Sequence, residues 1–209
     1  TFVSRKPSEN EIDYADITAT IFETGNDIGG TALATGNTIT YGNNNASTAP
    51  WNRSSSPISG IQLRHAAGNS ARFNTVSTIA TLTLAEIGIN ISSGTAPTGV
   101  TYTSTVSDNI ITMINTGTTA ITGIDFGHGI STGTIVGSNN TITLNQTATA
   151  ASAAAIIGIK ANYTNANNTC SSNTLIFNQS ETTGALSSTT TGMTLAGTSS
   201  GTITASSNN

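Results

Sequence analysis

The sequence predicts an all-β fold, a right-handed parallel β-helix (solenoid) of about five coils, with 31–37 residues and three short strands in each coil. Two short phrases that alternate along the chain support this prediction, and helical periodicity of useful length is absent. A packed core is available, because Ile, Val and Leu recur throughout and only 4 of the 209 residues are proline. A chain of this length can bury one sizeable core.

The first phrase is an asparagine followed by outward and apolar residues in alternation. Its copies begin, at steps of 37, 35, 31 and 33 residues, with Asn37, Asn74, Asn109, Asn140 and Asn173. Alternation with a period of two places the apolar residues on one face of a strand. Because stacked side-chain amides can hydrogen-bond along a column, we expect these asparagines to form a structural ladder.

The second phrase is a glycine, an apolar residue, a variable residue and a second apolar residue. Its copies begin with Gly60, Gly88, Gly123, Gly158 and Gly192. A shorter apolar piece, such as Val106 or Cys170, separates each second phrase from the next first phrase. Each coil therefore has three strands, and stacking buries what a single coil leaves exposed. The expected inward columns are Ile39, Val76, Ile111, Ile142, Leu175 and Ile61, Ile89, Ile124, Ile159, Met193.

These phrases resemble the repeats of pectin-lyase-like right-handed β-helices. They are most similar to the Thr-, Asn- and Gly-rich versions found in large bacterial secreted and surface proteins, including adhesins of Bacteroidota. The resemblance covers roughly residues 30 to 209 and implies an extracellular or cell-surface location. It does not imply one activity, because this fold occurs in lyases, adhesins and spikes alike.

The first 30 residues depart from the repeat and hold half of the charged residues of the chain. We predict that residues 1–30 form an N-terminal cap or lead-in segment. The parallel β-helix is predicted over residues 31–209, and we expect it to continue beyond them, since an uncovered stack end exposes unpaired strand edges.

Charged residues make up only 8% of the chain, against about 25% in typical domains. No basic stripe is present for nucleic acid, and no apolar run approaches the length of a membrane span, so we expect neither nucleic-acid binding nor membrane insertion. We predict no enzyme activity, catalytic residue, cofactor or metal site. The outward column of the second phrase holds Asp125 next to Lys160, which favours a weak surface salt bridge over catalysis.

Two outward columns of the first phrase are rich in threonine. They contain Thr38, Thr75, Ile110, Thr141, Thr174 and Thr40, Ser77, Thr112, Thr143, Ile176. Threonine suits an outward strand position by its β-propensity alone. The alternative is a flat face that binds a glycan or ice. The array resembles those of solenoid ice-binding proteins, but Ile110 and Ile176 depart from that pattern.

The candidate ligand-binding residues are Thr38, Thr40, Thr75, Thr112, Thr141, Thr143, Thr174 and Trp51. Trp51 lies in the connector 42–57 and is the best candidate for stacking on a sugar, although a loop tucked back over the coil would also explain it.

Three functions follow from these features. The first is a structural and adhesive solenoid segment of a large extracellular surface protein or fibre, whose partners are neighbouring segments of the parent protein or further copies of the chain. The second is an ice- or glycan-binding face made of the threonine ladders. The third is a carbohydrate-active enzyme that depends on Asp125.

Overall fold

The computed structural model describes residues 3–4, 12–14, 27–41, 58–64, 68–78, 85–92, 102–116, 119–127, 133–148, 155–163, 166–181, 189–197 and 202–209. In this part of the chain the strands form three sheets, and the helical content is one short 3-10 turn, η1 (Leu33–Thr35). Trp51 lies outside the described residues.

The three sheets are named here by their order along each coil. Sheet one contains β3 (Asp27–Gly29), β6 (Ser70–Arg72), β9 (Tyr102–Ser107), β12 (Gly133–Ser138), β15 (Ala166–Ser171) and β18 (Ile203–Ser206). Sheet two contains β4 (Thr38–Tyr41), β7 (Thr75–Thr78), β10 (Ile110–Asn115), β13 (Thr141–Ala148) and β16 (Thr174–Glu181). Sheet three contains β2 (Ile12–Tyr14), β5 (Ile58–Arg64), β8 (Glu86–Ser92), β11 (Ile121–Gly127), β14 (Ile156–Tyr163) and β17 (Thr190–Gly197).

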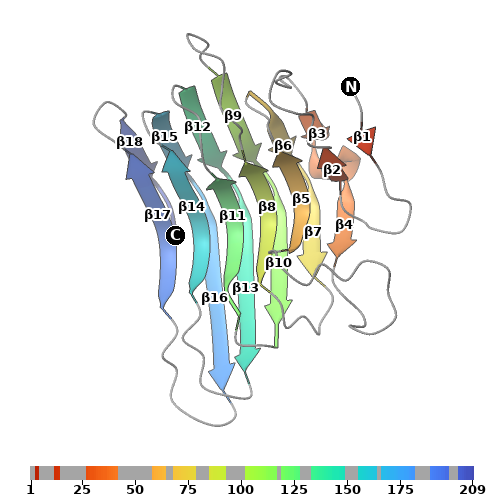
Figure 1. Ribbon diagram of the computed structural model, residues 1–209, viewed down its shortest axis with the longest axis vertical. Coiled ribbons are helices and arrows are strands. Elements are labelled where there is room, and N and C mark those ends of the chain that lie inside the picture. The colour runs from red at the N-terminus through yellow and green to blue at the C-terminus, as the bar shows by residue number, and fades with distance from the viewer. Residues whose placement is uncertain are drawn as a thin grey trace.

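Every strand pair in these sheets is parallel, and β1 (Val3–Ser4) is antiparallel to β2 at the N-terminal edge of sheet three. Strands that are one coil apart in the sequence lie side by side (Figure 1). The described chain thus makes five coils, from β3 to β17, and β18 begins a sixth.

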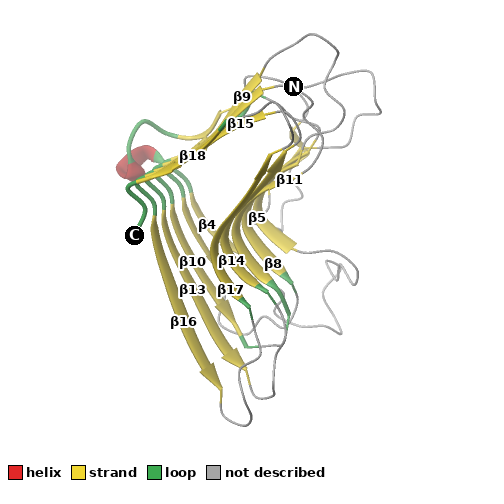
Figure 2. Cartoon of the chain, turned by 90° about the vertical axis from the view of Figure 1, so that its left-hand side faces the viewer, coloured by secondary structure: helices red, strands yellow, loops and turns green. Residues whose placement is uncertain are grey.

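The coils wind in a right-handed sense. Figure 2 views the stack from its C-terminal end, where the chain descends through sheet two, ascends through sheet three and crosses back through sheet one. This path is counter-clockwise while the chain advances toward the viewer. The predicted fold class, a right-handed parallel β-helix of about five coils, is confirmed.

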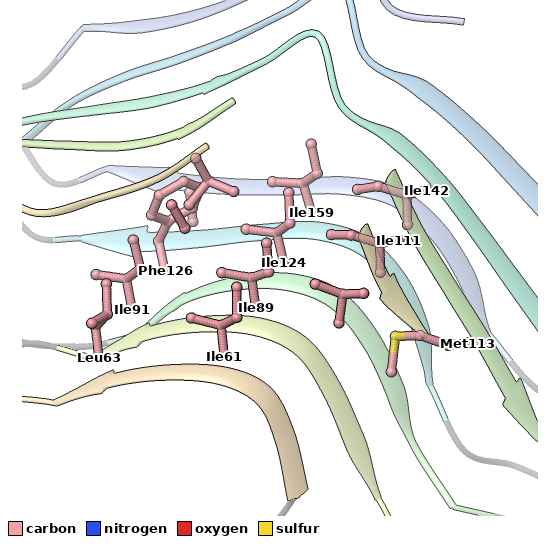
Figure 3. Close-up of a cluster of buried hydrophobic side chains, with 14 of the residues drawn as sticks. Ile61, Leu63, Ile89, Ile91, Ile111, Met113, Ile124, Phe126, Ile142 and Ile159 are labelled. Carbon is pink, nitrogen blue, oxygen red and sulfur yellow. The ribbon is translucent and has the colours of Figure 1, made fainter. Parts of the chain in front are cut away.

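The aliphatic core follows the two predicted columns. Register pairs join Ile39 to Val76, and Ile61 to Ile89, and continue through all five coils. Figure 3 shows Ile61, Ile89, Ile124 and Ile159 stacked in one row beside Ile111, Ile142 and Met113. The column members are buried through coil four, whereas Leu175 and Met193 in coil five are only partly buried.

The corner between sheets one and two depends on one residue in the left-handed region. The residues with this backbone are Phe73, Asp108, Asn139, Ser172 and Ser207, with φ between 52° and 58°. Each directly precedes an asparagine of the ladder. This conformation costs most L-residues about 1–2 kcal/mol, and asparagine and aspartate tolerate it best.

We expect Ser172→Asn to stabilise the chain by about 0.5 kcal/mol, because asparagine accepts the left-handed backbone more readily than serine. Ser172 is exposed, so the larger side chain meets no packing limit. Thermal unfolding should show a melting temperature higher by about 1–2 °C. Ser180→Asn is the control, since Ser180 is also exposed but its φ is not positive. An equal rise in both variants would contradict the assignment of the gain to backbone conformation.

Candidate ligand-binding face and buried polar groups

The outer face of sheet two carries all seven candidate threonines. The register pairs align them in the two predicted columns, including Ile110 opposite Thr75 and Ile176 opposite Thr143. Thr38, Thr40 and Thr141 are exposed, and Ile110 and Ile176 are 37% and 41% exposed. This face points away from the other two sheets, and no described segment lies over it (Figure 2). Its ability to bind a ligand stays a prediction.

Hydrogen bonds between outward side chains extend this polar face along the strands. The hydroxyls of Thr40 and Ser77 lie 3.2 Å apart, and Asn178 Nδ2 donates to Asn145 Oδ1 at 2.8 Å. The outward positions 110, 112 and 114 of β10, and their equivalents in the other described strands of this sheet, hold no charged residue. Recognition on this face would therefore depend on hydroxyl, methyl and amide groups.

The Asp125–Lys160 pair lies on the outer side of sheet three. Lys160 Nζ donates to Asp125 Oδ2 at 3.2 Å, as their predicted vertical adjacency suggests. Asp125 is only 9% exposed, so the pair is more buried than the surface salt bridge suggested by the sequence. Its register neighbours are Asn90 and Lys160. A second carboxylate, which glycoside hydrolysis usually requires, is not among these neighbours.

The asparagine ladder is a hydrogen-bonded column that is buried from Asn74 to Asn173. Asn109 Nδ2 donates to Asn140 Oδ1 at 3.0 Å and to the carbonyl oxygen of Ala71 at 2.9 Å. Its Oδ1 accepts from the backbone and side-chain nitrogens of Asn74, at 2.9 and 3.0 Å. The pattern repeats at Asn74, Asn140 and Asn173, while Asn37 donates to Asn74 Oδ1 at the N-terminal end and Asn208 adds a sixth rung. The predicted structural role of these residues is confirmed.

Glu86 is a buried acid that the sequence analysis did not single out. It is 1% exposed and occupies a column whose neighbouring members are Ile58 and Ile121. Its Oε1 accepts from Asn115 Nδ2 at 2.8 Å, and its buried Oε2 has no hydrogen-bond partner among the described residues. Burial raises the pKa of Glu86 from 4.5 to about 8, although the bond from Asn115 acts in the opposite direction.

A sequence signal for Glu86 exists. The residue two positions before each glycine of the second phrase is an isoleucine in three of the five copies, and a glutamate in the second copy. The fifth copy has Thr190 at this position. A charged residue where most copies have isoleucine indicates a buried acid.

A second amide column lies beside Glu86, where sheet two ends and sheet three begins. Register pairs stack Asn115, Gln146 and Gln179, and the first two are fully buried. Thr190 Oγ1 donates to Gln179 Oε1 at 2.6 Å, whereas the buried Gln179 Nε2 has no partner among the described residues. The interior is therefore polar at this corner, in contrast to the aliphatic columns that contain Ile111 and Ile124.

Other titratable groups in the described part do not form a cluster. Asp27 is paired with Arg72, whose hydrogen bond lowers the pKa of Asp27. Cys170 is buried in sheet one, and burial raises its pKa to about 11, which keeps it a thiol. Among the described residues, no three His, Cys, Asp or Glu side chains lie together as metal ligands would. No helix there is long and apolar enough to cross a bilayer.

We compared the chain with known protein families, curated proteins and solved structures. The chain matches no protein-family profile, no curated protein and no solved structure.

Proposed function

We propose that this chain is a structural and adhesive segment of a large extracellular surface protein or fibre. The observation that carries the proposal is the unbroken register of the three sheets through five coils. The resemblance of its two phrases to the repeats of pectin-lyase-like surface proteins, including adhesins of Bacteroidota, supports the same function.

The architecture suits a stiff spacer. Backbone hydrogen bonds in a parallel β-helix run along the stack, so three strand pairs and one asparagine rung join each coil to the next. A load along the axis is shared among these bonds. Partners of the segment would be neighbouring parts of the parent protein or further copies of the chain.

Surface location can be tested on intact cells of the organism that makes the protein. Antibodies raised against the 209-residue chain should label intact cells, and external protease should remove the label. Permeabilised cells and a cytoplasmic marker provide the controls. Labelling that appears only after permeabilisation would contradict the proposal.

The exposed, uncharged outer face of sheet two favours a second function, the binding of a glycan or an ice surface. Replacement of both Thr112 and Thr143 by lysine should weaken binding to a glycan array at least tenfold, or abolish thermal hysteresis, because charged side chains would project from the flat face. Thr194→Lys is the matched control, since Thr194 is an exposed threonine on sheet three. Unchanged glycan binding and thermal hysteresis in a folded double variant would exclude the outer face of sheet two as the binding surface.

We propose no catalytic role for Asp125, because its register neighbours are an amide and an ammonium group. Turnover of an acidic polysaccharide by the wild-type chain, lost in Asp125→Asn, would overturn this view and support a carbohydrate-active enzyme.

A further inference from the structure

Glu86 interrupts the isoleucines of a column inside the solenoid, which ends in coil five with the exposed Thr190. Strand β8 lies between β5 and β11, and its first residue pairs with Ile58 and Ile121. Ile121 and Ile156, the next two members of this column, are fully buried. A side chain that can carry a charge thus occupies a site shaped for an aliphatic one.

The contacts of Glu86 suit a neutral carboxylic acid. One oxygen accepts from Asn115 Nδ2, which also donates to Thr119 Oγ1 at 3.3 Å. The other oxygen is buried and has no partner among the described residues. An ionised carboxylate at this site would have no cation beside it among the described residues and would lose most of its solvation, which costs several kcal/mol in a protein interior.

Charged residues on the strands packed against β8 lie away from Glu86. Strands β7 and β10 contain none. Arg64 is the last residue of β5, at the end opposite to Ile58, and Asp125 lies on the outer side of β11, paired with Lys160. The pKa of Glu86 is raised by burial, and no charged neighbour contributes to the shift.

We propose that Glu86 is a proton-dependent latch between coils two and three, closed while its carboxyl group is neutral and opened by ionisation. Opening would separate the beginning of β8 from the end of β10, where Glu86 and Asn115 meet. It would also expose the amide column that contains Gln146 and Gln179. This property is independent of the proposed structural function.

The direction of the pH effect follows from the two pKa values. In the closed state Glu86 keeps its proton up to about pH 8. In the open state its hydrated carboxyl group has the ordinary pKa of 4.5 and releases the proton near that pH. Between these limits the closed state binds one more proton, so the opening constant rises about tenfold per pH unit. The latch is strongest below pH 4.5 and reaches its weakest level above pH 8.

Hydrogen exchange on the full chain tests the latch. Between pH 5 and pH 8, protection of the amides in β8 and β10, corrected for the intrinsic exchange rate, should fall by at least a hundredfold. Glu86→Gln keeps an oxygen for Asn115 and cannot ionise, so protection in that variant should change by less than about twofold. A flat wild-type profile, or an unchanged pH dependence in Glu86→Gln, would overturn the proposal.

A direct titration of Glu86 in the wild-type chain tests the proposal without the Glu86→Gln variant. With ¹³C-labelled glutamate, the Glu86 carboxyl signal of the wild-type chain should titrate near pH 8. A midpoint near 4.5 would overturn the latch even if Glu86→Gln did not fold.

Discussion

Asn140→Ala should destabilise the chain by about 4 kcal/mol, the largest effect that we expect from a single substitution. The Asn140 side chain donates to Asn173 Oδ1 and to the carbonyl oxygen of Val106, and its Oδ1 accepts two bonds from Asn109. Alanine would remove the bonds that Asn140 makes to the carbonyl oxygen of Val106 and to the backbone nitrogen of Asn109, whereas Asn109 Nδ2 and Asn173 Oδ1 would each keep one other bond. Each buried polar group that loses its partner costs about 1–3 kcal/mol, and relaxation of the corner recovers part of the total.

Chemical denaturation of the wild-type chain and the variant would measure this loss. Asn178→Ala is the matched control, because Asn178 is exposed and its side chain donates to the side chain of Asn145 on the outer face of sheet two. We expect that control to lose less than about 1 kcal/mol. Similar losses for the two variants would show that the ladder contributes no more than a surface amide pair.

The sequence predicted the ladder and the inward columns because both follow from repetition. Parallel strands place equivalent residues of successive coils above one another, so a recurring phrase specifies its own neighbours. Asn109 and Asn140 could therefore be paired from the repeat alone, and so could Ile124 and Ile159. The same logic placed the threonines of sheet two on one face and Asp125 beside Lys160.

Features that depend on departures from the repeat were harder to predict. Glu86 is the one charged residue at its position in the five copies, and its burial follows from the column that it enters rather than from its own residue type. The burial of Asp125 was also missed, because alternation shows which side of a sheet a residue faces but not how far solvent reaches that side. The left-handed residues share a position but no residue type, from Phe73 to Ser207, so composition gave no signal for them.

The glycines of the second phrase lead to the other large effect. A Cβ atom at Gly123 would lie 2.6 Å from the carbonyl oxygen of Gly158 and 2.6 Å from Ile142 Cγ2. The oxygen belongs to the backbone of the next coil and cannot move without disturbing sheet three. We therefore expect Gly123→Ala to destabilise the chain by about 3 kcal/mol, in the range found for overpacked cores.

Gly192→Ala should have the opposite sign, although Gly192 occupies the same position one coil after Gly158. A Cβ atom there would meet only Leu175 Cδ1, at 3.6 Å, which is an ordinary van der Waals contact. Neither Gly123 nor Gly192 has a positive φ, so alanine is compatible with both backbones. Because alanine lowers the entropy of the unfolded chain, Gly192→Ala should be neutral or stabilising by up to about 1 kcal/mol. Chemical denaturation of the two variants would compare their changes in the free energy of unfolding. Equal losses of stability would mean that the second phrase requires glycine for its backbone conformation. A loss for Gly123→Ala without a loss for Gly192→Ala would mean that it requires glycine because the next coil lies against it.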